Sequence, residues 1–380
     1  MFTKESIIST NLKIVPQNQE YIVGKNENYI ILDDEGVEIL KYLNGEYSIG
    51  EIENELLGEE EVDLIDFVET LYSLDLIDNI DGKNVENIKS KKKTITKFDK
   101  FLASFFFNKI CVMLYILLLI ITPTFCIVHK VYPNYKSIMI TDYSGLNILI
   151  FLLVSWLLLF IHEMGHYLAS IKLDIKTSFS ISTRYFWVVI EANLNELWQV
   201  ESSKRYVPFL GGIFFDITML FTALLLKVYV LDYKLLDLLI FILAYRMIWQ
   251  FLVFLRTDIY YLFLTFTNQT SLNTDAKSYL KSLLFNTKGD FSKIVRLYSI
   301  FIIIGFILSI VLFLGFQLPS LLVILKNAYY QLINNNIGTV QHIDGIITFM
   351  VIIVDLTLWI IGFMNKKRSN SNENNRIETY

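Results

Sequence analysis

The chain contains 380 residues, 54% of them hydrophobic, and carries a formal net charge of −5. This apolar content and a mean hydropathy of +0.47 exceed those of ordinary soluble domains, which excludes a purely soluble globular protein. Charge is divided unevenly, because residues 1–90 contain 21 Asp and Glu against 6 Lys and Arg, a net charge of −15, and the remainder carries +10. This division predicts an acidic soluble module followed by a membrane domain with basic flanks.

Residues 1–88 predict a small α+β module. Short β-rich runs separated by polar breaks indicate an antiparallel sheet, and helical patterns follow. The expected elements are strands at 12–15, 21–23 and 29–32, helices at about 37–43, 52–57 and 62–74, and a last strand from 76–77. Ser48 and Glu51 have the spacing of a capping box before the second helix. Strands followed by three helices are typical of a winged-helix-like unit.

Winged helices usually bind nucleic acid, but a net charge of −15 argues against phosphate contacts and so against that partner. The order of elements and the stretch LDDEGVEILKYLNGEYSIGEIENELL, residues 32–57, resemble the PqqD-like recognition element of ribosomal peptide-maturation systems. The resemblance implies that a leader peptide adds as a strand to the sheet edge at Tyr29, Ile30, Ile31 and Leu32, against the third helix. The alternative is a regulatory or purely structural cytosolic cap.

A basic linker at residues 89–109 leads into an α-helical polytopic membrane domain, expected at residues 110–365. Six apolar runs in this domain are long enough to cross a bilayer. They lie at about 110–128, 146–168, 208–230, 235–266, 297–316 and 346–364. A polar, Asn-rich tail at 366–380 is expected to be disordered.

The distribution of Lys and Arg predicts the orientation of these spans. The linker, the loops after the second and fourth spans and the start of the tail are rich in both residues, and all fall on one side if the spans alternate. The opposite loops, at 129–145, 231–234 and 317–345, carry only four cations. These are Lys130, Lys136, Lys234 and Lys326. Because the first residues also lack the apolar core of a signal peptide, we expect both termini in the cytoplasm of a cell-membrane protein.

Residues 175–194, between the second and third spans, predict a short β segment. Phe179, Ile181 and Thr183 alternate with polar residues, and an apolar run follows. This pattern indicates one or two strands at the cytoplasmic membrane face. Since backbone cannot lie unpaired in lipid, the strands must pair or lie at the interface. A free strand edge there would suit an extended substrate, and an ordinary interfacial hairpin fits the pattern equally well.

The second span contains the sequence HEMGH inside an otherwise apolar helix. His162 and His166 are one turn apart on one helix face, the spacing at which two imidazoles bind one Zn²⁺. Glu163 is placed to accept a proton from a water on the metal. Ionised groups inside a membrane helix cost about 3 kcal/mol each. This cost favours a zinc site over a chance match on a surface helix.

A catalytic zinc site needs a third protein ligand, and the membrane domain offers several carboxylates. His162 lies about eight residues before the end of its span, and Asp258 lies at a matching depth in the fourth span. Asp216 is about eight residues into the third span from the same side, so depth leaves both eligible. Asp355 falls in mid-span without a surrounding motif.

Three stretches resemble the site-2 protease class of membrane metalloproteases. They are HEMGHYLAS, PFLGGIFFD (208–216) and LRTDIYYL (255–262). The resemblance implies that Asp258 is the third ligand, because the family places an aspartate late in a downstream span. The chain departs from the family pattern in having Ile259 after the aspartate and no Asn-Pro before it. Arg246 and Arg256 are candidates for stabilising a carboxylate or an oxyanion, with lipid-interface or structural ion-pair roles as the alternative.

The sequence thus predicts a zinc metalloendopeptidase that cleaves a ribosomally made precursor peptide, with Glu163 as general base. The combination of both modules is similar to peptide zinc metalloproteases found beside bacterial peptide-maturation enzymes, which implies a peptide-modifying enzyme or an ABC exporter as a further partner. One alternative is regulated intramembrane proteolysis of a membrane-bound regulator. Another is a non-catalytic leader-binding scaffold for export or immunity, against which an intact Glu163 argues.

Overall fold

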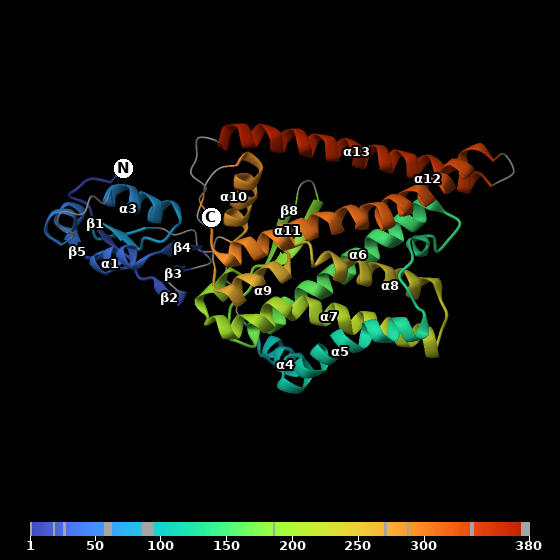
Figure 1. Ribbon diagram of the computed structural model, residues 1–380, viewed down its shortest axis with the longest axis horizontal. Coiled ribbons are helices and arrows are strands. Elements are labelled where there is room, and N and C mark those ends of the chain that lie inside the picture. The colour runs from blue at the N-terminus through green and yellow to red at the C-terminus, as the bar shows by residue number, and fades with distance from the viewer. Residues whose placement is uncertain are drawn as a thin grey trace.

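The computed structural model describes residues 2–17, 20–25, 28–56, 63–85, 95–184, 187–269, 272–286, 289, 291–334 and 338–373. It is mostly helical, with strands concentrated in the N-terminal module. Figure 1 shows this module at one end of a bundle of long helices that run roughly parallel to the long axis of the molecule.

The N-terminal module contains two small antiparallel sheets. The first has the order β2-β3-β4, formed by β2 (Lys13–Gln17), β3 (Glu20–Lys25) and β4 (Asn28–Leu32), and it confirms the three predicted strands. The second has the order β5-β1-β6-β7, formed by β1 (Ile7–Ser9), β5 (Asn44–Ser48), β6 (Asn79–Ile80) and β7 (Lys83–Asn84). The strand predicted from 76–77 therefore begins later, because Leu76 and Ile77 are buried in the core of the module.

The helices of this module follow their local sequence signals. Asp33 caps α1 (Asp34–Tyr42) by accepting a hydrogen bond from the amide of Gly36. The predicted capping box of Ser48 and Glu51 is present and begins α2 (Ile49–Glu51), which continues as a π-helical turn (Ile52–Leu56). A third helix, α3 (Leu64–Ser73), packs its apolar face into the common core. Residues 57–62 of the predicted helices lie outside the described residues.

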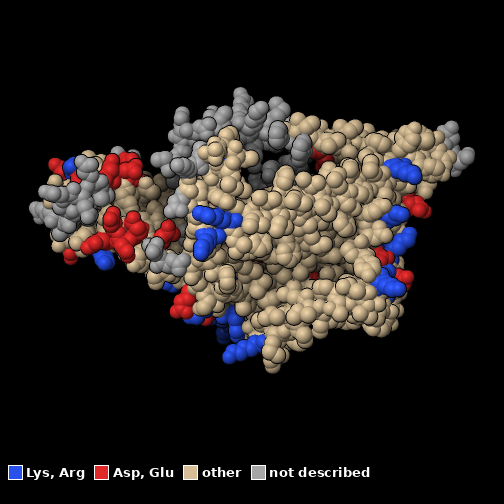
Figure 2. Space-filling view, viewed as in Figure 1, with Lys and Arg blue, Asp and Glu red and all other residues tan. Residues whose placement is uncertain are grey.

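Among the described residues, five helical stretches are long and apolar enough to cross a membrane. They are α5 (Lys109–His129), α6 (Ser144–Ile171), α7 (Ser202–Tyr229), the run Lys293–Ile333, and Thr339–Thr357 within α13 (Thr339–Glu373). The long run comprises α11 (Lys293–Leu312), a π-helical turn (Phe313–Gln317) and α12 (Leu318–Ile333). Figure 2 shows charged side chains gathered toward the two ends of the molecule, with a broad, almost uncharged band between them. These features indicate a membrane protein.

The predicted fourth span, 235–266, is not one helix, so the count of six spans is not confirmed. It divides into α8 (Lys234–Trp249), a 3-10 turn (Val253–Leu255) and α9 (Asp258–Thr267). Arg256 has a left-handed backbone conformation (φ +56°) between the turn and α9. The side-chain hydroxyl of Thr257 donates to the carbonyl of Gln250 (2.6 Å), and the side-chain Oε1 of Gln250 accepts from the amide of Asp258 (3.1 Å). Hydropathy does not detect this break, because the residues around it are apolar.

Part of the predicted linker, 89–109, is helical. Thr96 and Asp99 form a capping box at the start of α4 (Lys97–Phe106), and Lys100 pairs with Asp174 after the end of α6. Residues 86–94 lie outside the described residues, as do 374–380 of the predicted tail, and α13 extends to Glu373. One further helix, α10 (Leu272–Phe285), precedes α11.

Helices α6 and α7 pack closely through glycines. A Cβ added to Gly165 would collide with the backbone of Gly211, and a Cβ added to Gly211 would collide with the backbone of Gly165. Small residues allow membrane helices to approach closely. This contact fixes the helix that carries HEMGH against the helix that carries Asp216.

The N-terminal module contacts the membrane domain through Arg205 at the start of α7. The guanidinium is fully buried, donates from Nη1 to Oε1 of Gln17 (3.0 Å) and lies over the ring of Trp198, 4.9 Å from its centroid. It also donates to the carbonyls of Trp198 (3.2 Å) and Val200 (2.7 Å). Trp198 belongs to a 3-10 turn, η3 (Asn195–Gln199), so this arginine joins β2 of the module to a surface turn of the membrane domain.

We expect Gly211→Val to destabilise the membrane domain by about 1–3 kcal/mol, because its side chain would overpack against the backbone of α6. The measurement is the melting midpoint of the purified chain in detergent. Gly315→Val is the matched control, since nothing lies within 4 Å of an added Cβ there. Equal melting midpoints for the two variants would contradict the close packing of α6 and α7.

Candidate metal centre

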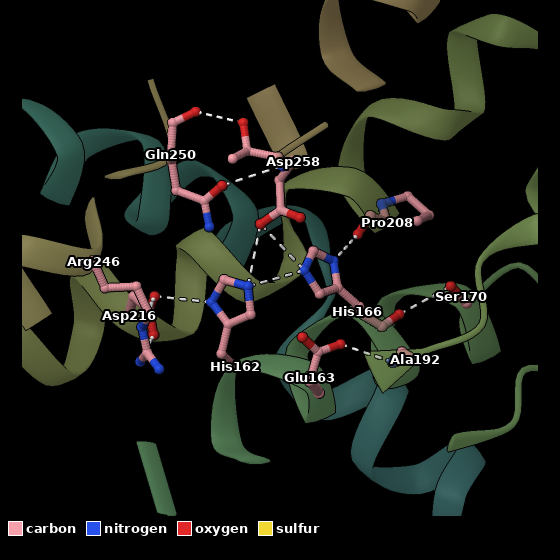
Figure 3. Close-up of polar contacts among 11 residues, drawn as sticks. His162, Glu163, His166, Ser170, Ala192, Pro208, Asp216, Arg246, Gln250 and Asp258 are labelled. Atoms are coloured by element: carbon pink, nitrogen blue, oxygen red, sulfur yellow. Dashed lines mark hydrogen bonds and ion pairs between the residues drawn. The ribbon is translucent and has the colours of Figure 1, made fainter. Parts of the chain in front are cut away.

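Two imidazoles and one carboxylate converge in the membrane domain. His162 and His166 lie near the end of α6, and Asp258 is the first residue of α9. Oδ2 of Asp258 is 3.1 Å from Nε2 of His162 and 3.3 Å from Nε2 of His166, and the two Nε2 atoms are 3.2 Å apart. Figure 3 shows these three side chains pointing toward one another. Both histidines are buried, and the group could bind a metal ion.

The outer nitrogens of both rings are already hydrogen-bonded. Nδ1 of His162 is 2.8 Å from Oδ2 of Asp216, and Nδ1 of His166 is 2.8 Å from the carbonyl oxygen of Pro208. A carboxylate and a carbonyl can only accept, so each Nδ1 carries the hydrogen and donates it. In the neutral rings, both Nε2 atoms therefore present lone pairs toward Asp258.

This arrangement fits a metal ion. Three acceptor atoms face one another, and no described residue donates a hydrogen bond to the buried Oδ2 of Asp258. A shared cation would relieve the repulsion between the three atoms. Ligand atoms about 2.0–2.1 Å from a tetrahedral ion lie roughly 3.3 Å from one another, close to the observed separations. A Cβ at Gly212 would collide with Nε2 of both histidines, so the glycine of α7 leaves room for the rings.

A second layer of residues holds the ligands in place. Arg246 of α8 donates from Nε to Oδ2 of Asp216 (2.9 Å) and also pairs with its Oδ1. Asp216 is fully buried, and this ion pair compensates its charge while it orients His162. Gln250 orients Asp258 through the backbone contact at the start of α9.

Glu163 lies beside the three converging side chains and faces a β-hairpin. Its Oε2 accepts a hydrogen bond from the amide of Ala192 (2.8 Å), the last residue of β9. Strands β8 (Phe179–Arg184) and β9 (Trp187–Ala192) pair antiparallel, which confirms the predicted β segment after the HEMGH helix. Residues 185 and 186 lie outside the described residues.

The three side chains border a cavity of about 420 Å³. Glu163, the end of β9 and the turn η3 line it on one side, and Trp249, Arg256 and Tyr261 line it elsewhere. A cavity of this size accommodates several residues of an extended peptide or a small molecule. The turn η3 also contacts the N-terminal module through the hydrogen bond from Gln199 to Tyr29, so the module abuts a segment that lines the cavity.

The structure brings together His162, His166 and Asp258 as the sequence predicted. Asp216, the rival third ligand, lies behind His162 and contacts its Nδ1. The comparison of the depths of Asp258 and His162 assumed that 235–266 is one continuous helix. The structure shows that this assumption is wrong. Arg246 was a candidate for stabilising a carboxylate or an oxyanion, or for a lipid-interface or structural ion-pair role, and it pairs with Asp216.

The predicted peptide-binding residues lie in the N-terminal module and not at the three converging side chains. Tyr29, Ile30, Ile31 and Leu32 belong to β4, which pairs only with β3 among the described strands. The Tyr29 hydroxyl accepts a hydrogen bond from Gln199 of η3. This contact was not predicted, and no local pattern signals it, since the two residues are 170 positions apart. Pro208, Ala192 and Gln250 were also missed, and two of these act through their backbone.

Comparison of the chain with protein-family models, with curated proteins and with solved structures gives no match.

We expect Asp216→Asn to weaken metal binding by about 10–100-fold, because the amide would break the ion pair with Arg246 and disturb the orientation of His162. Asp258→Asn should weaken it more, since that carboxylate contacts both rings. The measurement is metal content after competition with a chelator. Asp355→Asn, an exposed position of α13, is the control and should behave as the unaltered chain. Unchanged metal binding in Asp216→Asn would refute its orienting role.

Proposed function

We propose that the chain is a zinc endopeptidase of the membrane that cleaves a peptide substrate. The observation that carries the proposal is the convergence of His162, His166 and Asp258, with Glu163 beside them at a cavity. Two imidazoles and one carboxylate are a donor set typical of catalytic zinc, which keeps one position for water or substrate. The resemblance to site-2 proteases supports the same reading.

A zinc ion at this site would supply a Lewis acid that activates water and polarises a peptide carbonyl. His162, His166 and Asp258 would hold it, with Asp216 and the Pro208 carbonyl fixing the ring orientations. Glu163 accepts the proton released from the attacking water and passes it to the leaving amine. The hydrogen bond from Ala192 holds the Glu163 carboxylate at the cavity wall. Arg246 forms an ion pair with Asp216. Arg256 lines the cavity, where it would stabilise negative charge on the substrate.

We expect Glu163→Gln to retain metal and fold while peptide cleavage falls by about 10²–10⁴-fold, because glutamine cannot accept the proton. Cleavage of a candidate precursor by the purified chain in detergent, followed by mass spectrometry, measures the effect, and metal content is measured in parallel. The control is Glu201→Gln, an exposed position whose carboxylate pairs with Lys204 outside the cavity. A Glu163→Gln variant that cleaves at the normal rate would remove the assigned base.

The proposed substrate is a ribosomally made precursor peptide captured by a PqqD-like N-terminal module. The position of β4 supports this, since it is an edge strand of its sheet among the described strands and a peptide strand can add to a sheet edge. The two parts touch through Gln17 and Arg205, and η3 borders the cavity, so a captured peptide would be held near the cleavage site. We place both termini in the cytoplasm and the protein in the cell membrane, with a peptide-modifying enzyme or an ABC exporter as further partners.

Capture at β4 predicts a specific change in hydrogen exchange. Alternate amides of Tyr29 to Leu32, those directed away from β3, should exchange several-fold more slowly when the precursor is added to the Glu163→Gln variant, because the added strand would pair with them. The measurement is hydrogen–deuterium exchange with mass spectrometry. Strand β2 (Lys13–Gln17), at the opposite edge of the same sheet, is the internal control and should not change. Bound peptide without protection of β4 would contradict this docking mode.

A further inference from the structure

A second cavity, of about 380 Å³, lies at the end of the bundle away from the N-terminal module. The segment after α5, the end of α7 and the start of α8 form it. Its charged lining consists of Lys130, Lys136, Lys227, Lys234 and Asp237. Four ammonium groups around one cavity repel one another unless an anion offsets them.

The concentration of these lysines at one cavity contrasts with the small number of cations in the segments at this end of the molecule. The three segments at 129–145, 231–234 and 317–345, which were predicted as loops from the sequence, contain four lysines and no arginine, and three of those lysines line this single cavity. Only Lys326, on α12, lies elsewhere. The cations at this end of the molecule are therefore concentrated at one place.

Protein carboxylates neutralise only part of this charge. Lys227 pairs with Asp232 (2.6 Å) and Asp237 (2.8 Å), and Lys234 donates to the carbonyl of Ile140 (3.2 Å). Lys130 and Lys136 are exposed and form no ion pair with any described residue. Four ammonium groups and two carboxylates leave an excess of two positive charges, which favours binding of an anionic phosphate group.

The surroundings of the cavity indicate where such a phosphate comes from. Tyr132, Tyr229 and Tyr233 are 59%, 66% and 54% exposed beside it, and Val230 and Leu231 are exposed between them. Exposed tyrosines at the ends of apolar helices are typical of the membrane–water interface, the depth at which lipid headgroups lie. We propose that this cavity binds the phosphate headgroup of an anionic lipid through Lys130, Lys136, Lys227 and Lys234.

The test compares lipid retention by the purified full-length chain with native mass spectrometry. Mixed micelles contain either phosphatidylglycerol or phosphatidylcholine, and a third arm contains inorganic phosphate alone. We expect selective retention of phosphatidylglycerol and a loss of roughly tenfold or more in its affinity in the variant Lys130→Gln/Lys136→Gln. Lys326→Gln, which removes the one lysine of the same three segments that does not line the cavity, should bind as the unaltered chain.

A charge-preserving variant, Lys130→Arg/Lys136→Arg, should retain selectivity and thereby separates loss of charge from loss of fold. Three outcomes would overturn the proposal. They are equal retention of both lipids, binding of free phosphate without retention of phosphatidylglycerol, and a loss in Lys326→Gln as large as in the double glutamine variant. Peptide cleavage is not a readout here, so the result is independent of the proposed function.

Discussion

The membrane domain depends on one constraint: three acceptor atoms face one another in a buried setting. Hydrogen bonds to Asp216 and Pro208 commit the Nδ1 atoms of the two rings and turn both Nε2 lone pairs toward Asp258. Without a cation the three atoms repel, and with one they become its ligands. Three buried acceptor atoms stay close together only when the surrounding structure holds them there, and the neighbouring helices hold these three.

Each neighbouring element holds one part of this group of side chains in place. The glycine contact between α6 and α7 brings Asp216 and Pro208 to the rings, and the break after α8 turns Asp258 inward. In a continuous helix through 235–266, Asp258 would lie within an apolar span and not at the start of a helix. With the break, Asp258 becomes the first residue of α9, where a carboxylate is also favoured by the helix dipole.

The parts of the structure that the sequence predicted are those with a local pattern. The two histidines of HEMGH are one helical turn apart, and apolar and polar residues alternate in the hairpin near Phe179. Polar breaks separate the strands β2, β3 and β4. The assignment of Asp258 over Asp216 came from resemblance, since depth could not distinguish them. The break at residues 250–257 and helix α4 were missed, the first because its neighbours are uniformly apolar and the second because its lysines suggested a linker. Contacts such as Gln17 with Arg205, 188 positions apart, have no signal in a single sequence.

The buried guanidinium of Arg205 has a consequence for any shortened form of the chain. Its Nη1 hydrogen bond depends on Gln17, whereas its other acceptors, the Trp198 and Val200 carbonyls, belong to the membrane domain. Removal of the first ninety residues would take away one acceptor and part of the cover of this cation, which contacts Trp198, a residue that lines the larger cavity. Water would have to enter there or the turn would have to rearrange. The N-terminal module thus supports a turn that lines the cavity, and activity lost on truncation would not by itself show that the module recognises substrate.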